Sequence, residues 1–232
     1  MVRSRIAIFM VILLFFGSLA IMTLMNDEQY LPVALFMVCA SIVPFFLRFE
    51  RRSLQAREIV LVAVISAIAA VGRVPFAALP SVQPTSFVII VSALVFGSET
   101  AFMVGAVSAL VSNMFLGQGP WTPWQMFGWG MVGWTAGTLY QWGWLKNRFM
   151  LIAFGFVWGF LFGWIMNIWF LANMGQDLTW AAVLAAYASS FYFDLVHALC
   201  NVFFLAVLGP GWVKILERYK TKYGLLEADF SK

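Results

Sequence analysis

The feature that most constrains this chain is a series of eight apolar runs, most of them near the length that crosses a lipid bilayer. A transmembrane helix needs ~20 predominantly apolar residues. Charged residues make up 10% of the chain, whereas a soluble domain carries ~25%. The sequence therefore predicts an all-α integral membrane protein with no room for a soluble domain. The runs occupy residues 5–25, 31–48, 58–73, 84–97, 99–117, 124–143, 149–172 and 181–209.

The fourth run is the shortest, and we expect its helix to be tilted or sheltered by neighbouring helices. Ser98, followed by Glu99, resembles a helix N-cap with an acidic first turn. A tight turn should therefore separate the fourth and fifth runs.

The basic residues predict the topology, because cytoplasmic loops of membrane proteins are enriched in Lys and Arg. With the N-terminus in the cytoplasm, 13 of the 14 basic residues fall on that side and only Arg73 lies toward the outside. The sequence thus predicts a multi-pass protein of the plasma membrane with both termini cytoplasmic. A cleaved signal peptide is an alternative for the first run, since Ser18 and Ala20 form a small-x-small site. The basic residues flank spans rather than form a patch, which argues against a nucleic-acid partner.

The basic stretch at residues 48–57 divides the chain. Residues 1–50 hold two bland helices, and residues 51–232 hold six helices followed by a short cytoplasmic tail. In the first of these six, Ala63, Ala67 and Ala70 place small residues on one side. Such faces let transmembrane helices approach closely.

The stretch from Asn113 to Gln125 breaks the helical pattern, since it holds two glycines and two prolines. It also carries two tryptophans and two glutamines. Irregular backbone at membrane depth is tolerated only where it is sheltered or lines a cavity. We expect the stretch to line or cap a binding site. An interfacial turn with aromatic anchors is the alternative.

Polar groups within the runs share a depth. With a rise of ~1.5 Å per residue, they lie about 21 to 27 Å from the cytoplasmic end of each run. That is the outer half of a hydrocarbon layer ~30 Å thick. A pocket open to the outside fits this pattern, whereas a channel would need polar groups throughout. The groups are Arg73, Asn113, Gln125, Asn167 and Asp194.

The last run adds a polar stripe at helical spacing: Tyr187, Ser190, Asp194, His197 and Asn201. The stripe predicts either a pocket wall or hydrogen bonds between helices. Since His197 is the only histidine, we expect no metal site, and no cofactor is indicated. Arg73 lies at the height of Asp194, so it could pair with that carboxylate or extend to the outer headgroups.

The six later runs resemble the S component of an energy-coupling-factor (ECF) transporter. The resemblance rests on the Ala63-x-x-x-Ala67 face, the segment from Ser112 to Gln125, and the final helix with Asp194, His197 and Asn201. It implies a six-helix bundle, here preceded by two extra N-terminal helices. That bundle would capture a vitamin or similar micronutrient from outside.

The resemblance also implies a gating loop, here residues 74–85 with Gln83, and partners in the bilayer. Ala63, Ala67 and Ala70 would dock on a transmembrane scaffold (T) subunit that couples to two cytoplasmic ATPases. The segment from Gly117 to Gln125 is most similar to the cobalamin-type branch, which implies cobalamin or a corrinoid precursor. A riboflavin-type vitamin is the alternative. The predicted substrate-binding residues are Gln83, Asn113, Gln118, Trp121, Thr122, Trp124, Gln125, Asn167, Asp194 and His197.

Two other classes compete. A membrane enzyme would need a convergent acid, base or metal set, for which Asp194 with His197 is the one candidate pair. A secondary transporter would show internal repeats and polar groups in the inner half. The sequence has no Gly-x-x-x-x-Gly-Lys-Ser/Thr loop, so we predict no ATP hydrolysis by that route and no catalytic residues.

Overall fold

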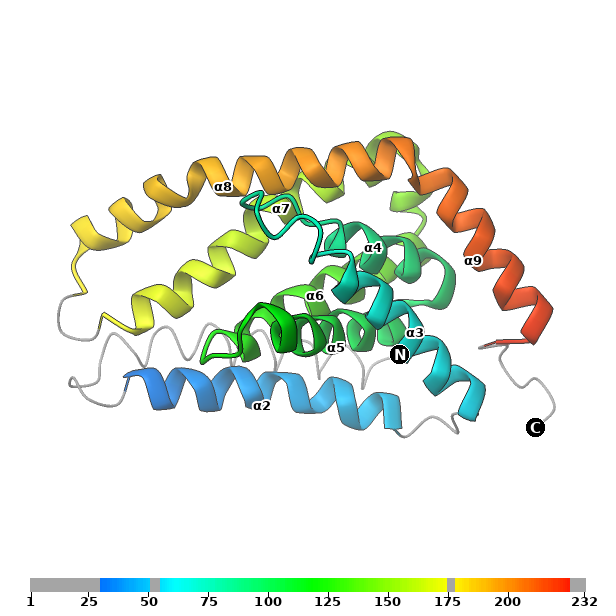
Figure 1. Ribbon diagram of the computed structural model, residues 1–232, viewed down its shortest axis with the longest axis horizontal. Coiled ribbons are helices and arrows are strands. Elements are labelled where there is room, and N and C mark those ends of the chain that lie inside the picture. The colour runs from blue at the N-terminus through cyan, green and yellow to red at the C-terminus, as the bar shows by residue number, and fades with distance from the viewer. Residues whose placement is uncertain (1–29, 51–54, 175–177, 226–232) are drawn as a thin grey trace.

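The computed structural model describes residues 30–50, 55–174 and 178–225, and within them all regular structure is helical (Figure 1). The first predicted run, residues 5–25, lies outside the described residues. The helices confirm an all-α membrane protein. Three of the described helices are each long and apolar enough to cross a bilayer: α5 (Ser98–Leu116), α7 (Arg148–Ala172) and α8 (Trp180–Val207). The elements are α2 (Tyr30–Glu50), α3 (Ala56–Val71), α4 (Thr85–Phe96), α5 (Ser98–Leu116), α6 (Thr122–Gln141), the 3-10 helix η1 (Trp144–Lys146), α7 (Arg148–Ala172), α8 (Trp180–Val207) and α9 (Gly209–Tyr223).

The short fourth run becomes α4, which has 12 residues and is buried along nearly its whole length. A helix of that length rises only ~18 Å, so it depends on its neighbours for cover, as expected. The turn to α5 is a single residue, Gly97, at φ 87°. The predicted N-cap is wrong by one position: Gly97 occupies it, and Ser98 is the first residue of α5. Glycine is favoured at Gly97 because a side chain at this φ would be strained.

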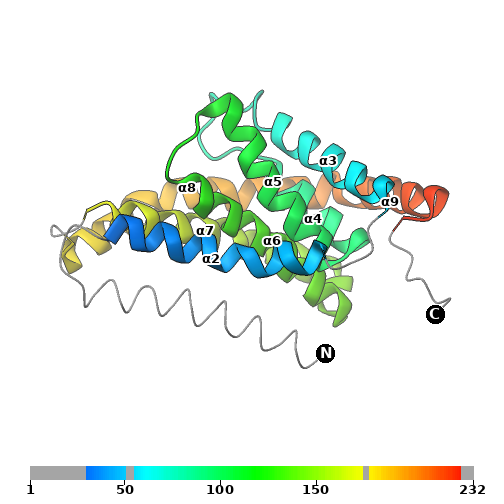
Figure 2. The same cartoon turned by 90° about the horizontal axis from the view of Figure 1, so that it is seen from below.

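The centre of the bundle is the pair α5 and α6, which pack backbone to backbone. A Cβ atom on Gly133 would lie 2.4 Å from the Ala101 carbonyl oxygen, and one on Gly105 would lie 2.3 Å from the Trp129 carbonyl oxygen. Small residues at these positions permit the close approach. Helix α2 covers α5 and α6 on one side, where Phe45 stacks on Phe102 at 3.9 Å (Figure 2).

Helix α9 occupies much of the stretch expected to form a short C-terminal tail. It is amphipathic, with Leu216 buried and Lys214, Arg218 and Lys222 exposed at four-residue spacing. Because the apolar face of α9 is narrow, its residues do not form an apolar run, and the hydropathy pattern did not predict this helix. Lys220 Nζ donates to the Val95 carbonyl oxygen at the end of α4 (2.8 Å), so α9 is fixed to the bundle.

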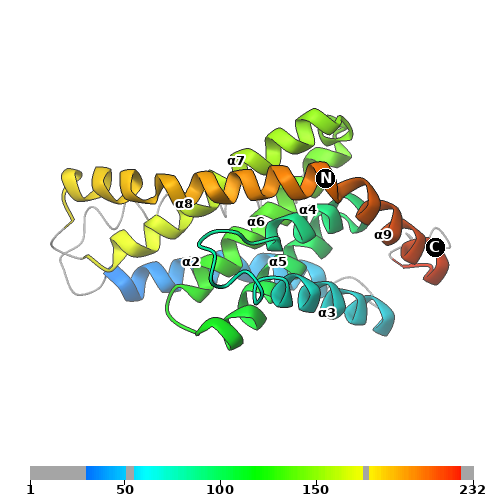
Figure 3. The same cartoon turned by 45° about the horizontal axis from the view of Figure 1, so that its top comes forward.

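The bundle has two distinct ends. At what we call the basic end, α3 begins, α4 meets α5, α6 meets α7, and α8 meets α9 (Figure 3). There Arg57 Nη1 donates to the Tyr223 carbonyl oxygen (2.6 Å), and Arg148 Nη2 donates to the Ala206 carbonyl oxygen (2.8 Å). At the opposite end, the loop end, lie the α3–α4 loop and the α5–α6 turn. The polar groups singled out in the sequence lie toward the loop end.

Candidate functional site

Arg73, directly after α3, points into the bundle and is 6% exposed. Its Nη1 donates to Ser112 Oγ and to Asn113 Oδ1 (3.2 Å), and its guanidinium carbon lies 4.7 Å from the centre of the Trp129 ring. Both expectations for Arg73 are therefore wrong. It does not extend toward headgroups, and it forms no ion pair with Asp194. A guanidinium suits this position because it can donate in its plane and stack on an aromatic face.

The Asn113–Gln125 segment closes on itself. Asn113 Nδ2 donates to Thr122 Oγ1 (3.0 Å) and to Gln125 Oε1 (2.7 Å). Thr122 Oγ1 donates to Gln118 Oε1 (2.9 Å), and Gln118 Nε2 donates to the Leu110 carbonyl oxygen (2.9 Å). These side chains satisfy one another's hydrogen-bonding groups, and buried polar groups in proteins are generally hydrogen-bonded in this way. In this structure the segment is a hydrogen-bonded turn between α5 and α6.

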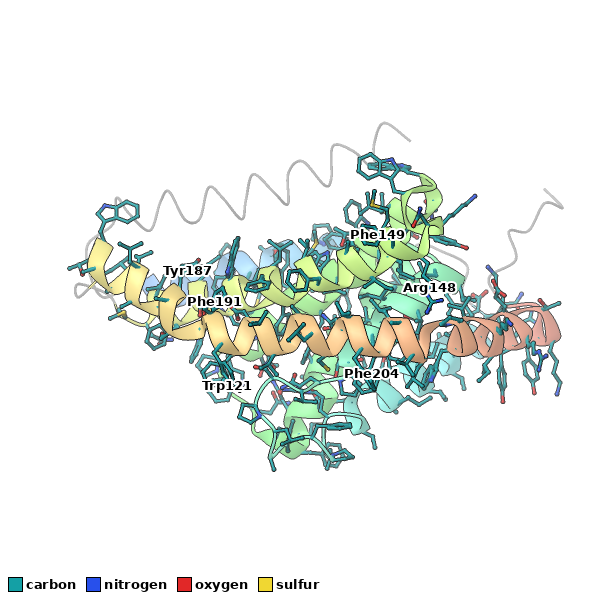
Figure 4. All side chains as sticks on the ribbon, turned by 90° about the horizontal axis from the view of Figure 1, so that it is seen from above. Trp121, Arg148, Phe149, Tyr187, Phe191 and Phe204 are labelled. Atoms are coloured by element: carbon teal, nitrogen blue, oxygen red, sulfur yellow. The ribbon has the colours of Figure 1, made fainter. Side chains whose placement is uncertain are left out.

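The two tryptophans of this turn pack within the protein. Trp124 is 1% exposed and belongs to the core. Trp121 is half-buried and meets Trp169 of α7 edge to face, with ring centres 5.6 Å apart. In the view of Figure 4, Trp121 and Tyr187 lie on opposite sides of the α8 axis. The buried Trp124 ring therefore offers no free face for stacking a large ligand.

Helices α7 and α8 pack along a seam of glycines that the sequence analysis missed. Gly155, Gly159 and Gly163 follow at four-residue spacing and so share one face of α7. A Cβ atom on Gly159 would lie 2.4 Å from the Ala198 backbone, and one on Gly163 would lie 1.8 Å from Asp194 Oδ1. The signal was available, because a repeated Gly-x-x-x-Gly pattern in an apolar run indicates helix packing.

Toward the loop end, α7 and α8 diverge (Figures 1 and 3), and two adjoining cavities occur between them. The inner one has a volume of about 220 Å³, and the outer one about 330 Å³. They share Met166, Asn167, Ser190 and Phe193, and thus form one site with two compartments. The inner compartment is lined by Ser81, Gln83, Phe162, Gly163, Met166, Asn167, Ser190, Phe193, Asp194 and His197. The outer compartment is lined by Met166, Asn167, Trp169, Phe170, Ala186, Ser189, Ser190 and Phe193.

A chain of hydrogen bonds positions the acid of the inner compartment. Asn167 Nδ2 donates to Ser190 Oγ (2.8 Å), and Ser190 Oγ donates to Asp194 Oδ2 (3.0 Å). Asp194 is 5% exposed and lies against Gly163, whose missing side chain leaves room for the carboxylate. The residues of the polar stripe thus divide by role. Ser190 and Asp194 line the cavity, whereas Asn201 Nδ2 donates to the Gly155 carbonyl oxygen (3.0 Å) across the seam.

His197 belongs to a second set of bonds. Its Nε2 lies 2.9 Å from Ser86 Oγ, which also accepts a hydrogen bond from Trp129 Nε1 (3.1 Å). His197 and Asp194 therefore bond to different partners and not to each other. They do not form the acid–base pair that a membrane enzyme would require.

The structure brings together four of the ten predicted substrate-binding residues: Gln83, Asn167, Asp194 and His197. The other six lie in the α5–α6 turn or beside it and line neither compartment: Asn113, Gln118, Trp121, Thr122, Trp124 and Gln125. Ser81, Met166 and Phe193 were missed, because a single apolar or small residue carries no sequence signal of its own.

Only part of the predicted docking face is exposed. Ala63 and Ala67 are exposed on α3, next to Val60 and Val64, which are 59% and 50% exposed. Ala70 is fully buried and cannot belong to that surface. Helix α3 lies at the edge of the bundle, where it packs mainly against α5 (Figure 2).

A larger cavity of about 500 Å³ lies at the basic end, where Lys146 and Lys220 contribute to its lining. None of the predicted substrate-binding residues reaches it. Under the topology inferred from the basic residues, it faces the cytoplasm and so could not receive a solute from outside. Within the described part of the chain, no three His, Cys, Asp or Glu side chains group as metal ligands.

A family model described as "ECF-type riboflavin transporter, S component" matches residues 53–218. Among curated proteins, UPF0397 proteins from Aliivibrio fischeri strain MJ11 and Aliivibrio salmonicida strain LFI1238 are each 28% identical over 90 residues. That alignment covers 37% of this chain and 49% of each relative, so the chain spans about half the length of the curated relatives it matches. No solved structure matches.

Proposed function

Because the chain belongs to the family of ECF-type riboflavin transporter S components, we propose that it captures riboflavin, or a flat vitamin of similar size. Its family consists of transporter subunits rather than enzymes. The observation that carries the proposal is the two-compartment cavity between α7 and α8. One compartment holds Asp194, Asn167 and His197, and the other is walled by Trp169 and Phe170. A ligand with an aromatic ring system and polar edges would use both compartments.

Riboflavin suits this site better than a corrinoid does. The matched family model names riboflavin, so it does not support the cobalamin-type branch suggested by the Gly117–Gln125 segment. The compartments have volumes of about 220 and 330 Å³, below and just above the lower limit of ligand sites, which run from ~300 to ~1,000 Å³. A corrinoid macrocycle with its side groups would need far more room. The tryptophans expected to stack on it are also packed within the protein.

The proposed orientation follows from the charge pattern. With the basic end in the cytoplasm, the α7–α8 cavity opens toward the outer side, where a nutrient arrives. Gln83 and Ser81 of the α3–α4 loop contribute to its lining. This loop is therefore the candidate cover for the site.

The exposed face of α3 is the candidate surface for the scaffold (T) subunit, which would in turn bind the two ATPases. Ala63 and Ala67 would let a partner helix approach closely. Val60 and Val64 would supply apolar contact. The face lies on the outside of the bundle, away from the α7–α8 cavity, so it could bind a partner while the cavity holds a ligand.

A titration of the purified full-length protein tests the substrate. Riboflavin fluorescence should be quenched as the protein is added, with no ATP present, because the flavin ring would lie among aromatic side chains. Cobalamin, measured by calorimetry under the same conditions, should not bind. Saturable binding of cobalamin without binding of riboflavin would overturn the assignment.

A further inference from the structure

Helix α9 runs at an angle to α8 and is fixed to the basic end of the bundle (Figure 1). Pro210 lies where the chain turns, because it has no backbone N–H with which to continue the α8 helix. The Trp212 ring meets Phe87 of α4 edge to face, with ring centres 5.5 Å apart. At the other end of α9, Arg57 Nη1 donates to the Tyr223 carbonyl oxygen (2.6 Å). Both ends of α9 are therefore held, so its outer surface is in place before any partner binds.

The outer surface of α9 carries two strips of side chains. The apolar strip has members that are each about half exposed: Ile215, Tyr219 and Tyr223. The basic strip has members that are each exposed: Lys214, Arg218 and Lys222. Within each strip the residues recur every four positions and so share one side of the helix. Since each basic residue directly precedes a member of the apolar strip, the two strips run side by side along α9.

Charge is distributed unevenly around α9. Its one acidic residue, Glu217, lies two positions from both Ile215 and Tyr219, and positions two apart lie on nearly opposite sides of a helix. The basic strip instead borders the aromatic rings, since Lys222 Nζ lies 5.2 Å from the centre of the Tyr223 ring. The rings of Tyr219 and Tyr223 stack on each other, with centres 5.9 Å apart. The basic residues also line a surface groove of about 550 Å³, to which Glu217 and Thr221 contribute the rest of the lining.

An apolar strip beside a row of cations suits the boundary between lipid acyl chains and headgroups. Tyrosine is enriched at membrane interfaces, and lysine and arginine can reach headgroups while their stems cover apolar surface. A helix with these two strips can lie in the plane of the interface. With the basic end in the cytoplasm, α9 lies at the leaflet whose anionic lipids attract basic side chains.

We propose that α9 binds anionic phospholipids of the cytoplasmic leaflet, with its apolar strip against the acyl chains and its basic strip against the headgroup phosphates. The inference goes beyond the proposed function and does not depend on the substrate, because α9 lies at the basic end and the α7–α8 cavity lies toward the loop end. Salt weakens this binding, because it screens the charges of the basic strip and the phosphates.

The first test measures which lipids the full-length protein retains. Wild type and Lys214→Gln/Arg218→Gln/Lys222→Gln are placed in nanodiscs of equal parts phosphatidylglycerol and phosphatidylcholine and extracted into mild detergent. The retained lipids are then quantified by mass spectrometry. The triple variant should lower the ratio of phosphatidylglycerol to phosphatidylcholine about fivefold or more, because one basic side chain near an anionic surface already changes affinity about fivefold. Lys214→Arg/Arg218→Lys/Lys222→Arg is the matched control, which keeps the charge and should behave as the wild type.

The second test locates the apolar strip in phosphatidylglycerol nanodiscs. A nitroxide label is attached to Ile215→Cys or to Glu217→Cys in a full-length protein that carries Cys39→Ala, since the other native thiol, Cys200, is buried. The label at position 215 should collide more often with oxygen, which concentrates among acyl chains. The label at position 217 should collide more often with a water-soluble nickel chelate. The two positions form a matched pair, because they lie on the same helix and face opposite ways.

Each failure has its own signature. If the glutamine variant retains the same lipid ratio as the wild type, or if both labels are equally accessible to the nickel chelate, α9 does not bind the leaflet. A glutamine variant that keeps its lipids and no longer co-purifies with the scaffold and ATPases would show that the basic strip binds a protein instead. Riboflavin should bind the wild type and the glutamine variant equally. Its failure to bind either would overturn the proposed substrate and leave this inference intact.

Discussion

Replacing Gly159 by alanine tests the packing of α7 on α8, on which the cavity depends. The added Cβ would lie 2.4 Å from both the backbone nitrogen and the Cα of Ala198. An ordinary contact begins near 3.4 Å, so the helices must separate by about 1 Å. The clash is with backbone, and no change of side-chain rotamer can relieve it. Over-packing of this kind typically costs about 1–3 kcal/mol.

The assay is thermal unfolding of the full-length protein in detergent, with riboflavin titration beside it. A loss of about 1–3 kcal/mol corresponds to a melting temperature lower by roughly 2–12 °C for a chain of this size. Riboflavin should also bind more weakly, because Gly163 and Asp194 lie one turn further along the same seam. Replacing Ala198 by glycine in the same variant should restore little stability, since it removes only the Cβ contact at 2.7 Å and leaves the backbone nitrogen and Cα at 2.4 Å.

Gly211→Ala is the matched control. It makes the same chemical change within a helix, but its Cβ would meet nothing within 4 Å. It should be neutral or slightly stabilising, because alanine is the better helix former. Gly155→Ala should be intermediate, since its Cβ would clash with the tip of the flexible Leu205 side chain and make an ordinary contact with Asn201 Cβ at 3.4 Å. Equal stability of Gly159→Ala and Gly211→Ala would refute the account of the seam.

Three further predictions concern other parts of the structure. Ala63→Leu or Ala67→Leu should leave riboflavin binding intact and abolish uptake in cells that contain the scaffold and ATPases. Ala70→Leu, which changes a buried residue, should instead lower the melting temperature. Normal uptake in both surface variants would rule out the exposed face of α3 as the docking surface. Gln125→Ala should reduce stability by about 0.5–1.5 kcal/mol, as expected for one lost hydrogen bond, and leave riboflavin affinity unchanged. A loss of affinity without a loss of stability would show that the α5–α6 turn is part of the binding site. Arg73→Lys should also lower the melting temperature, because an ammonium cannot donate to two acceptors on α5 while it stacks flat on an indole; a melting temperature equal to that of the wild type would contradict this role.

Much of the helical framework could be predicted because its signals are local. Run length and the glycines and prolines between runs placed α3 to α8 within a few residues of their observed limits. The short α4 was recognised as needing cover from its neighbours. Helix α9 was not predicted, because its apolar face is narrow and its remaining residues read as a charged tail.

The residues predicted for the candidate site were likewise only partly correct. Asp194, His197 and Asn167 could be identified because polar side chains are costly to bury inside a membrane span and usually occur there at functional sites. Asn113 and Gln125 satisfied the same rule, yet they pair with each other across the α5–α6 turn.

The sequence by itself determined the helices that arise from apolar runs and the common depth of the polar groups within them, since both depend on neighbours along the chain. Only the tertiary structure decided which of those groups face a cavity. That outcome depends on how two helices cross. Glycines at 155, 159 and 163 bring α7 onto α8 near the middle of the bundle, and the helices diverge beyond them, so Asp194 and His197 border a space. The close packing of α5 and α6 leaves no such space for Asn113 and Gln125.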